Sequence, residues 1–344
     1  MEKNSLALYV RKKCSYAQRN KFAMTTILSV DVGANNVTTN SDSDTCADTE
    51  KMSSAINLYV PPLLIILGAV CNTLIIITMR TKYFRSLSTS VYLSSGAVND
   101  IIGLLVALIP HWLYLNFPDI FVRTDISQGM CKFFNFYGWA NTDLGIIITT
   151  TMTAERATAV VFPLKSAIRC TRKKARIIVG LVITIVIIKD FHFLISSDIV
   201  SVGRTERLCD VSAVDETYRT FWLDVWPGLH LFYLSVCFSI IVISNSVIIH
   251  RVRNSLAEQI SGLQRWRHLA PMLIGESVIL VLLTFPMAIY LSGLALKLRY
   301  NPNLYENHEI KANDKLAFSV TYYMLYSNKC VNFFIYHVTG LRFR

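Results

Sequence analysis

Long apolar segments alternate with short polar connectors over most of the chain, beginning near Ala55. Each segment approaches or exceeds the roughly 20 residues that an α-helix needs to cross a bilayer. None shows the two-residue alternation of a membrane β-strand. The pattern therefore predicts an all-α membrane protein, a bundle of seven transmembrane helices. The predicted spans are residues 56–79, 89–115, 131–162, 176–196, 222–249, 270–296 and 316–338.

Residues 1–54 have a different character, because they are polar, rich in Ser, Thr, Asn and Asp, and lack a sustained hydrophobic period. This composition is typical of a disordered tail. Its basic first part has no long apolar core, so we do not predict a cleaved signal peptide. Asn36, followed by Val and Thr, fits the short N-glycosylation acceptor motif, which applies only if the tail is external. Met24 and Met52 are alternative start sites.

The third apolar segment has Cys131 near one end and Glu155-Arg156 near the other. As an α-helix, those roughly 25 residues would cover about 37 Å, slightly more than the hydrocarbon thickness of a bilayer. Asp143 lies between the two ends, and a carboxylate at that depth is costly unless it faces a protein interior or a water-filled cavity. This helix is therefore expected inside the bundle.

Basic residues gather in alternate connectors, whereas the intervening connectors are mixed or acidic. By the positive-inside rule the basic connectors are cytoplasmic and the N-terminus is extracellular. The net charge of +11 then follows membrane topology, and the chain carries no nucleic-acid-binding signature. The basic connectors contain Arg80, Lys82 and Arg85; Lys165, Arg169, Arg172, Lys173 and Lys174; and Arg251, Arg253, Arg265 and Arg267.

The eight cysteines form neither a CxxC motif nor a Cys/His metal pattern. Cys71, Cys237 and Cys330 lie inside apolar segments and are expected to be small core residues. Cys131 and Cys209 both belong to the outer side, where an oxidising environment permits a disulfide.

The fourth span is interrupted by Lys189-Asp190, followed by His192. Neighbours in a helix point in different directions, so these two charges need not pair with one another. Two interpretations stay open. Either the residues lie near the outer end and extend their charged heads to water, or one of them lines a ligand cavity.

Short polar motifs occur at characteristic places in the predicted spans. They are Asn72 in GAVCNTLIII, Asp100 in LSSGAVNDIIGLL, Glu155-Arg156-Ala157 followed by Pro163-Leu164, Pro286 in LLTFPMAIY, and Asn328, Asn332 and Tyr336 in NKCVNFFIY. Together with seven spans and an external N-terminus, they resemble the rhodopsin-like (class A) G-protein-coupled receptors. The resemblance divides the chain into a tail (1–54), a seven-helix receptor domain (55–338) and the start of an eighth helix (339–344).

The resemblance implies a structural role at one end of the third span and a signalling role at the other. Cys131 is expected to form a disulfide with Cys209 in the second outer loop. Arg156 is expected to pair with Glu155 at rest and to be released when a partner docks, as a two-state element. The residues implied in G-protein coupling are Glu155, Arg156, Pro163, Leu164 and Tyr336.

A polar switch network is implied at mid-membrane. Asp100 needs polar partners there, because an isolated buried carboxylate is costly. Asn72, Asn328 and Asn332 are expected to supply them, with a sodium ion as a candidate allosteric ion. Gly145 stands where the family often has Ser, which weakens the sodium assignment. No other cofactor and no metal centre is expected.

Pro286 is the expected hinge of the sixth span, because proline removes a backbone hydrogen bond and kinks a helix. The Cys-Trp pair that the family places before this proline is absent, and Phe285 is its partial substitute. Acidic residues at the inner end of this span are replaced by Arg265-Trp266-Arg267, so no lock from there to Arg156 is expected.

The ligand class is narrowed by exclusion. Gly138 stands where amine receptors carry an aspartate, and Tyr326 stands where opsins carry a lysine. An acidic outer face and the NFxxY motif resemble invertebrate peptide receptors. The E-R-A triplet and the absence of tryptophan from the fourth span resemble mollusc chemosensory receptors, and both interpretations stay open. The candidate pocket residues are Gly138, Trp139, Tyr290, Tyr322 and Tyr326.

We therefore expect a plasma-membrane receptor whose partners are an extracellular peptide or small-molecule ligand, a heterotrimeric G protein and membrane lipid, and not nucleic acid. A transporter or channel is the remote alternative, although the spans show no internal repeat. An enzyme is not expected, because HExxH, GxSxG and a facing aspartate pair are all missing from the sequence.

Overall fold

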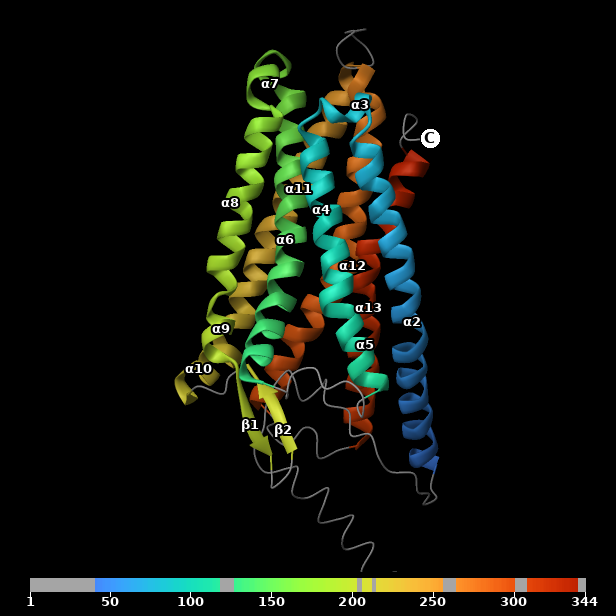
Figure 1. The fold of residues 1–344 in the computed structure, drawn as a ribbon, viewed down its shortest axis with the longest axis vertical. Helices are drawn as coiled ribbons and strands as arrows, with labels where there is room; N and C mark the ends of the chain where they lie inside the picture. Colours follow the sequence, from blue (N-terminus) through green and yellow to red (C-terminus); the bar gives the residue numbers. More distant parts are fainter. Residues whose placement is uncertain are drawn as a thin grey trace, which may run out of the picture.

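The computed structural model describes residues 41–117, 127–202, 206–211, 215–255, 264–300 and 308–339. Within these ranges seven long helices run side by side along the molecule (Figure 1). This confirms the predicted all-α membrane bundle. The helices are α2 (Ser41–Met79); α4 (Thr89–Gly103), continued by the π-turn η2 (Leu104–Leu108) and α5 (Ile109–Asn116); α6 (Gln128–Val161); α8 (Arg172–Asp190); η3 (Phe221–Val225) with α11 (Trp226–Ser255); α12 (Gln264–Tyr300); and α13 (His308–Thr339).

Short elements connect the long helices at the two ends of the bundle. At one end lie α3 (Lys82–Arg85) and α7 (Pro163–Arg169) (Figure 1). The opposite end carries α9 (His192–Ser196), α10 (Glu216–Thr220) and an antiparallel hairpin of β1 (Asp198–Val202) and β2 (Glu206–Asp210). The hairpin, in which Ile199 faces Cys209, is the one departure from helix among the described elements.

The first helix begins earlier than the sequence pattern predicts. Residues 41–54 are helical, so the predicted tail without regular structure does not include them. This segment contains neither glycine nor proline, and an established helix propagates more easily than a new one nucleates. The apolar span can therefore extend into it. Asn36 and residues 340–344, which include most of the expected eighth helix, lie outside the described residues.

Among the residues that the structure describes, five helical spans are long enough and apolar enough to cross a membrane, judged by length and composition. The other two long helices, α6 and α13, carry polar and charged side chains that are buried in the bundle, such as Asp143 and Lys329. The five apolar spans are Ala47–Met79, Thr89–Asn116, Arg172–Ser196, Thr217–Arg251 and Ile274–Lys297.

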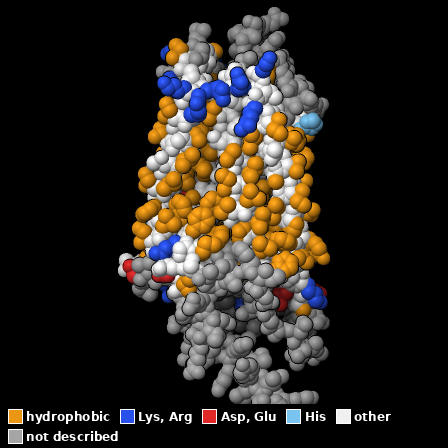
Figure 2. Space-filling view, in the orientation of Figure 1, with side chains coloured by type: hydrophobic (Ala, Val, Ile, Leu, Met, Phe, Trp, Pro, Cys, Tyr) orange, Lys and Arg blue, Asp and Glu red, His pale blue; other side chains and the backbone are white. Residues whose placement is uncertain are grey.

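The outer surface has the polarity that a bilayer requires. Figure 2 shows apolar side chains covering the middle of the bundle, with Lys and Arg gathered at the end that carries α3 and α7. Exposed basic residues of the described connectors include Arg80, Arg85, Lys165 and Lys173. A basic end beside an apolar band is the arrangement that the positive-inside rule describes. The chain is therefore a multi-pass membrane protein.

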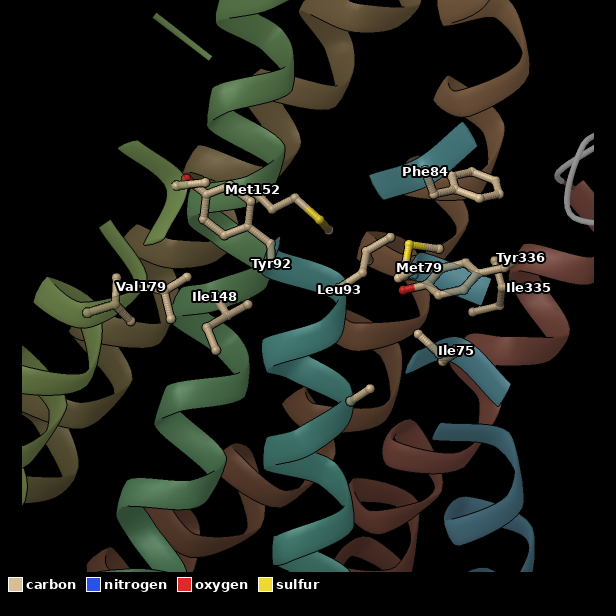
Figure 3. Close-up of a cluster of buried hydrophobic side chains, with 13 residues drawn as sticks. Ile75, Met79, Phe84, Tyr92, Leu93, Ile148, Met152, Val179, Ile335 and Tyr336 are labelled. Atoms are coloured by element: carbon tan, nitrogen blue, oxygen red, sulfur yellow. The ribbon is translucent and has the colours of Figure 1, made fainter. Parts of the chain in front are cut away.

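A buried apolar cluster joins five of the long helices near the basic end of the bundle. Figure 3 shows Tyr92 of α4 beside Met152 of α6, and Tyr336 of α13 near Met79 of α2. Tyr92 and Tyr336 are each 1% exposed. Because interiors are close-packed, such a cluster holds the helices at defined distances. Members of the cluster, including Tyr92 and Met152, also line the polar cavity described below.

Candidate functional site

A disulfide joins Cys131, in the first turn of α6, to Cys209 in β2, with the two Cα atoms 5.5 Å apart. The predicted bridge is thus present in the structure. Asn135, one helical turn further along α6, donates a hydrogen bond to Ser197 Oγ at 3.1 Å. Gln128 donates to Asp198 Oδ2 at 2.7 Å. Asn135 also donates a hydrogen bond to Cys209 Sγ at 3.3 Å. The hairpin and the residue before it are therefore fastened to the end of α6 by one covalent bond and three hydrogen bonds.

The opposite end of α6 carries a buried ion pair. Arg156, which is 3% exposed, pairs with its neighbour Glu155 and also contacts Ser88 of the α3–α4 connection. Ser88 donates to Glu155 Oε1 at 2.5 Å, and the Tyr92 hydroxyl donates to Oε2 at 2.7 Å. The expected Glu155–Arg156 pairing is present, and Glu155 also connects α6 to α4. Sequence reasoning did not anticipate Ser88 and Tyr92.

Two further residues of the expected coupling set follow α6 directly. Pro163 is exposed and opens α7, where proline is favourable because the first helical N–H has no intrahelical partner. Leu164 lies in the same short helix, but its side chain is outside the described residues. Both belong to the basic end of the bundle (Figure 1).

A small polar cavity of about 40 Å³ lies between α2, α4, α6, α12 and α13. The Nζ atom of Lys329 lies 3.1 Å from Oδ1 of Asp100, and both residues are buried. Asn72 donates to the carbonyl oxygens of Gly68 and Lys329 at 2.8 and 2.7 Å. The polar lining comprises Asn72, Asp100, Thr142, Thr149, Glu276, Thr284, Asn328, Lys329, Asn332 and Tyr336.

The structure brings the four predicted network residues to one cavity but pairs them differently. Asp100 accepts a hydrogen bond from Lys329. The side-chain oxygens of Asn72, Asn328 and Asn332 have no hydrogen-bond partner among the described residues. The sequence contained a signal for this pairing. A lysine inside an apolar span needs a counter-ion, and Lys329 directly follows Asn328 of the Asn328, Asn332 and Tyr336 motif.

A sodium ion at Asp100 does not fit these residues. The Lys329 ammonium already places a full positive charge beside the carboxylate. A second cation about 4 Å from that ammonium would be repelled by roughly 4 kcal/mol at an effective dielectric constant of about 20. Gly145 lines the cavity without a side-chain oxygen that could complete a coordination shell.

Two polar contacts connect α12 to its neighbours beside this cavity. The side chains of Glu276 and Tyr336 are hydrogen-bonded, which ties α12 to α13. The hydroxyls of Thr153 and Ser277 lie 3.3 Å apart and tie α6 to α12. Sequence reasoning missed Glu276, although a lone carboxylate in an apolar span is a signal for a buried polar partner.

The expected hinge lies within α12, where Pro286 is an internal helix residue. Phe285 is 37% exposed, and its ring lies 5.9 Å from that of Phe238 on α11. Thr284, rather than Phe285, lines the polar cavity. The rotational setting of α12 therefore directs the expected aromatic substitute away from the cavity.

The candidate pocket residues fall into two groups. Trp139 of α6 stacks on Phe193 at 5.6 Å and meets Trp222 and Trp226 edge to face, at 5.9 and 6.1 Å. This cluster packs α6 against α9, η3 and α11. Gly138, the residue before Trp139, has open space around the position of a Cβ atom.

The tyrosines of the candidate pocket lie on α12 and α13. The ring centre of Phe318 lies 6.2 Å from that of Tyr290 and 5.2 Å from that of Tyr322. The ring centres of Tyr322 and Tyr326 lie 4.8 Å apart. The Tyr290 hydroxyl also donates to the carbonyl of Asp314 at 3.1 Å. The structure thus brings these three tyrosines together and places Trp139 in a separate aromatic cluster.

A second buried charge cluster crosses from α6 to α8. Lys189 Nζ lies 2.5 Å from Asp143 Oδ2 and 2.6 Å from Asp190 Oδ1, and both aspartates are fully buried. The ammonium also lies 4.8 Å from the centre of the Trp226 ring. Lys189 therefore points into the bundle and pairs with its neighbour. The interpretation in which these charges extend to water at the outer end is wrong.

These arrangements suit conformational change within the bundle. Among the described residues, no group of three or more His, Cys, Asp or Glu side chains could hold a metal ion. Buried polar contacts instead connect neighbouring helices at several points along the bundle, and each can be made or broken by a small helix displacement.

Comparison with known proteins identifies a family. A family model described as "7 transmembrane receptor (rhodopsin family)" matches residues 52–336. The matched range begins within α2 and ends at Tyr336 of α13. A search of curated proteins found no match.

Proposed function

The chain belongs to the rhodopsin family of seven-transmembrane receptors, and from that premise we propose that it couples an extracellular ligand to heterotrimeric G proteins at the plasma membrane. The family is one of signalling receptors rather than enzymes. In the proposed orientation, the hairpin and the start of α2 are extracellular, and the basic end with α3 and α7 is cytoplasmic (Figure 1). The positive-inside rule supports this orientation.

The observation that carries the proposal is the course of α6. This single helix, Gln128–Val161, begins at the disulfide with Cys209 and ends beside the buried Glu155–Arg156 pair. Over about 30 residues an α-helix covers about 45 Å. A displacement at the ligand side can therefore reach the cytoplasmic side through one continuous element.

In the resting state we assign the holding role to Glu155, Ser88 and Tyr92. Their hydrogen bonds keep the carboxylate beside Arg156. Docking of a G protein favours a state in which Arg156 leaves Glu155 and contacts the partner. By linkage, ligand and G protein then increase each other's affinity, because both favour that state.

For the ligand we propose a peptide. Gly138 offers open space in place of an acidic anchor. Tyr290 and Tyr322, which are partly exposed, present aromatic surface on α12 and α13 beside the buried Tyr326. The outer connectors are mixed or acidic, which favours a basic or amidated peptide by charge complementarity. A small waterborne ligand is the second candidate, favoured by the tight packing of the Trp139 cluster, which leaves a peptide little room near α9.

A ligand screen tests this proposal. Cells that express the full chain are exposed to amidated peptides and, separately, to small waterborne odorants, and calcium and cyclic nucleotides are recorded. We expect a response to peptides that is lost in Arg156→Ala at equal surface amount. A response to odorants alone would overturn the peptide assignment. A response that Arg156→Ala retains would overturn the assigned coupling role.

A further inference from the structure

Lys329 and Asp100 form a buried ion pair between α13 and α4, at the cavity described above. Nζ and Oδ1 lie 3.1 Å apart, and the two residues are 5% and 7% exposed. Among the described residues, Asp100 is the single acceptor within hydrogen-bonding distance of this ammonium group. The ammonium has three donors, so two of them remain for water in the cavity.

We propose that Lys329 is a built-in cation that takes the place of a sodium ion at Asp100, so that the stability and the resting state of this receptor do not depend on sodium. The ammonium supplies the charge that a bound ion would otherwise supply. It is covalently attached, so it cannot dissociate when the sodium concentration falls.

The other groups that face the cavity are compatible with this assignment. Glu276, the second carboxyl group, is hydrogen-bonded to Tyr336, and its Oε2 atom is an acceptor without a partner among the described residues, which water in the cavity can reach. The side-chain oxygens of Asn72, Asn328 and Asn332 are acceptors without a partner among the described residues, and water bound to the ammonium can donate to them. The cavity of about 40 Å³ is large enough for water.

The pair also has a mechanical consequence. It joins α4 to α13, the helix that carries Tyr336. A bound sodium ion would let α13 move once the ion left, whereas a tethered ammonium must move together with α13. Displacement of α13 therefore stretches or breaks the Asp100–Lys329 contact itself.

The test measures thermal unfolding of the purified full chain in sodium, potassium or choline chloride at equal ionic strength. We expect the wild-type unfolding temperature to be the same in all three salts. Lys329→Ser should gain a sodium-specific rise of roughly 3 °C or more, and Asp100→Asn/Lys329→Ser should lose it. Lys51→Ser, which removes an exposed ammonium, should behave as the wild type.

Two results of this salt comparison would overturn the proposal. One is a sodium-specific rise in the wild type that Asp100→Asn abolishes. The other is a folded Lys329→Ser protein without any sodium response. If Lys329→Ser does not fold, Lys329→Gln replaces it. In addition, Asp100→Asn should be less stable than Asp100→Asn/Lys329→Met, because the single variant leaves a buried ammonium unpaired; the reverse order would refute the pair.

Discussion

The hydroxyl of Tyr92 on α4 donates a hydrogen bond of 2.7 Å to Oε2 of Glu155 on α6. This bond holds the carboxylate that pairs with Arg156. Tyr92→Phe removes it, and a hydrogen bond to a charged group contributes about 1.5–3 kcal/mol. If the bond exists only at rest, basal G-protein activation should rise roughly tenfold or more. Tyr59→Phe, at an exposed position, is the control, and unchanged basal signalling in Tyr92→Phe would contradict the assigned role of Glu155.

The disulfide between Cys131 and Cys209 closes a segment with a sequence separation of 78 residues. Losing a native disulfide costs about 2–5 kcal/mol in small secreted domains. Cys131→Ser and Cys209→Ser should therefore lower surface expression, and the double variant should resemble either single one. Flow cytometry with an N-terminal tag measures this. Cys170→Ser changes a cysteine outside the disulfide and should leave expression unchanged; an equal loss there would show that the effect is not specific to the bridge.

Gly275 on α12 lies against Ile335 on α13, and an added Cβ atom would approach Ile335 Cγ2 to 2.8 Å. Gly275→Ala must therefore displace the Ile335 side chain or move α12 away from α13, near the Glu276–Tyr336 contact. Overpacking typically costs about 1–3 kcal/mol. We expect this cost to destabilise the resting state and therefore to raise basal signalling. Adding Ile335→Ala should reverse the rise. Gly180→Ala, which has open space around its Cβ position, should have no effect, and a rise that persists in the double variant would refute the steric cause.

Lys189 pairs with two buried carboxylates. Replacing Lys189 should therefore destabilise the protein more than replacing one of the two aspartates. Lys189→Met leaves Asp143 and Asp190 without their shared cation. Breaking a buried pair costs about 3–5 kcal/mol. Asp143→Asn leaves the Lys189–Asp190 pair intact and should cost clearly less. Thermal unfolding of the purified proteins measures both, and equal losses would argue against a shared ammonium.

Much of the fold is predictable from the sequence, because the length of each apolar span and the positions of the charged residues can be read directly from the order of the residues. The seven helices, the Cys131–Cys209 bridge and the Glu155–Arg156 pair are all present as expected. The pair follows from the resemblance of the Glu155-Arg156-Ala157 triplet to the family's motif, and adjacency alone would not have predicted it. The bridge follows from the family resemblance, which supplies the partner of Cys131.

The contacts between helices are harder to predict, because they depend on how each helix is rotated. Phe285 is the expected substitute for a core aromatic residue, yet it faces Phe238 on α11. Lys329 lies within the recognisable NKCVNFFIY motif of the seventh span, but its partner on α4 is 229 residues away in sequence. The sequence pattern places the start of the first helix too late. Residues 41–54 have the polar composition of a disordered tail, although they contain no glycine or proline that would interrupt a helix.

The most direct test of the central claim is guanine-nucleotide exchange on purified heterotrimeric G proteins by the full chain in lipid nanodiscs. The wild-type receptor should accelerate exchange above the receptor-free rate for at least one G-protein class. Arg156→Ala should return it to that rate, whereas Arg80→Ala, an exposed arginine at the same end, should not. Equal exchange by the wild type and Arg156→Ala would contradict the account.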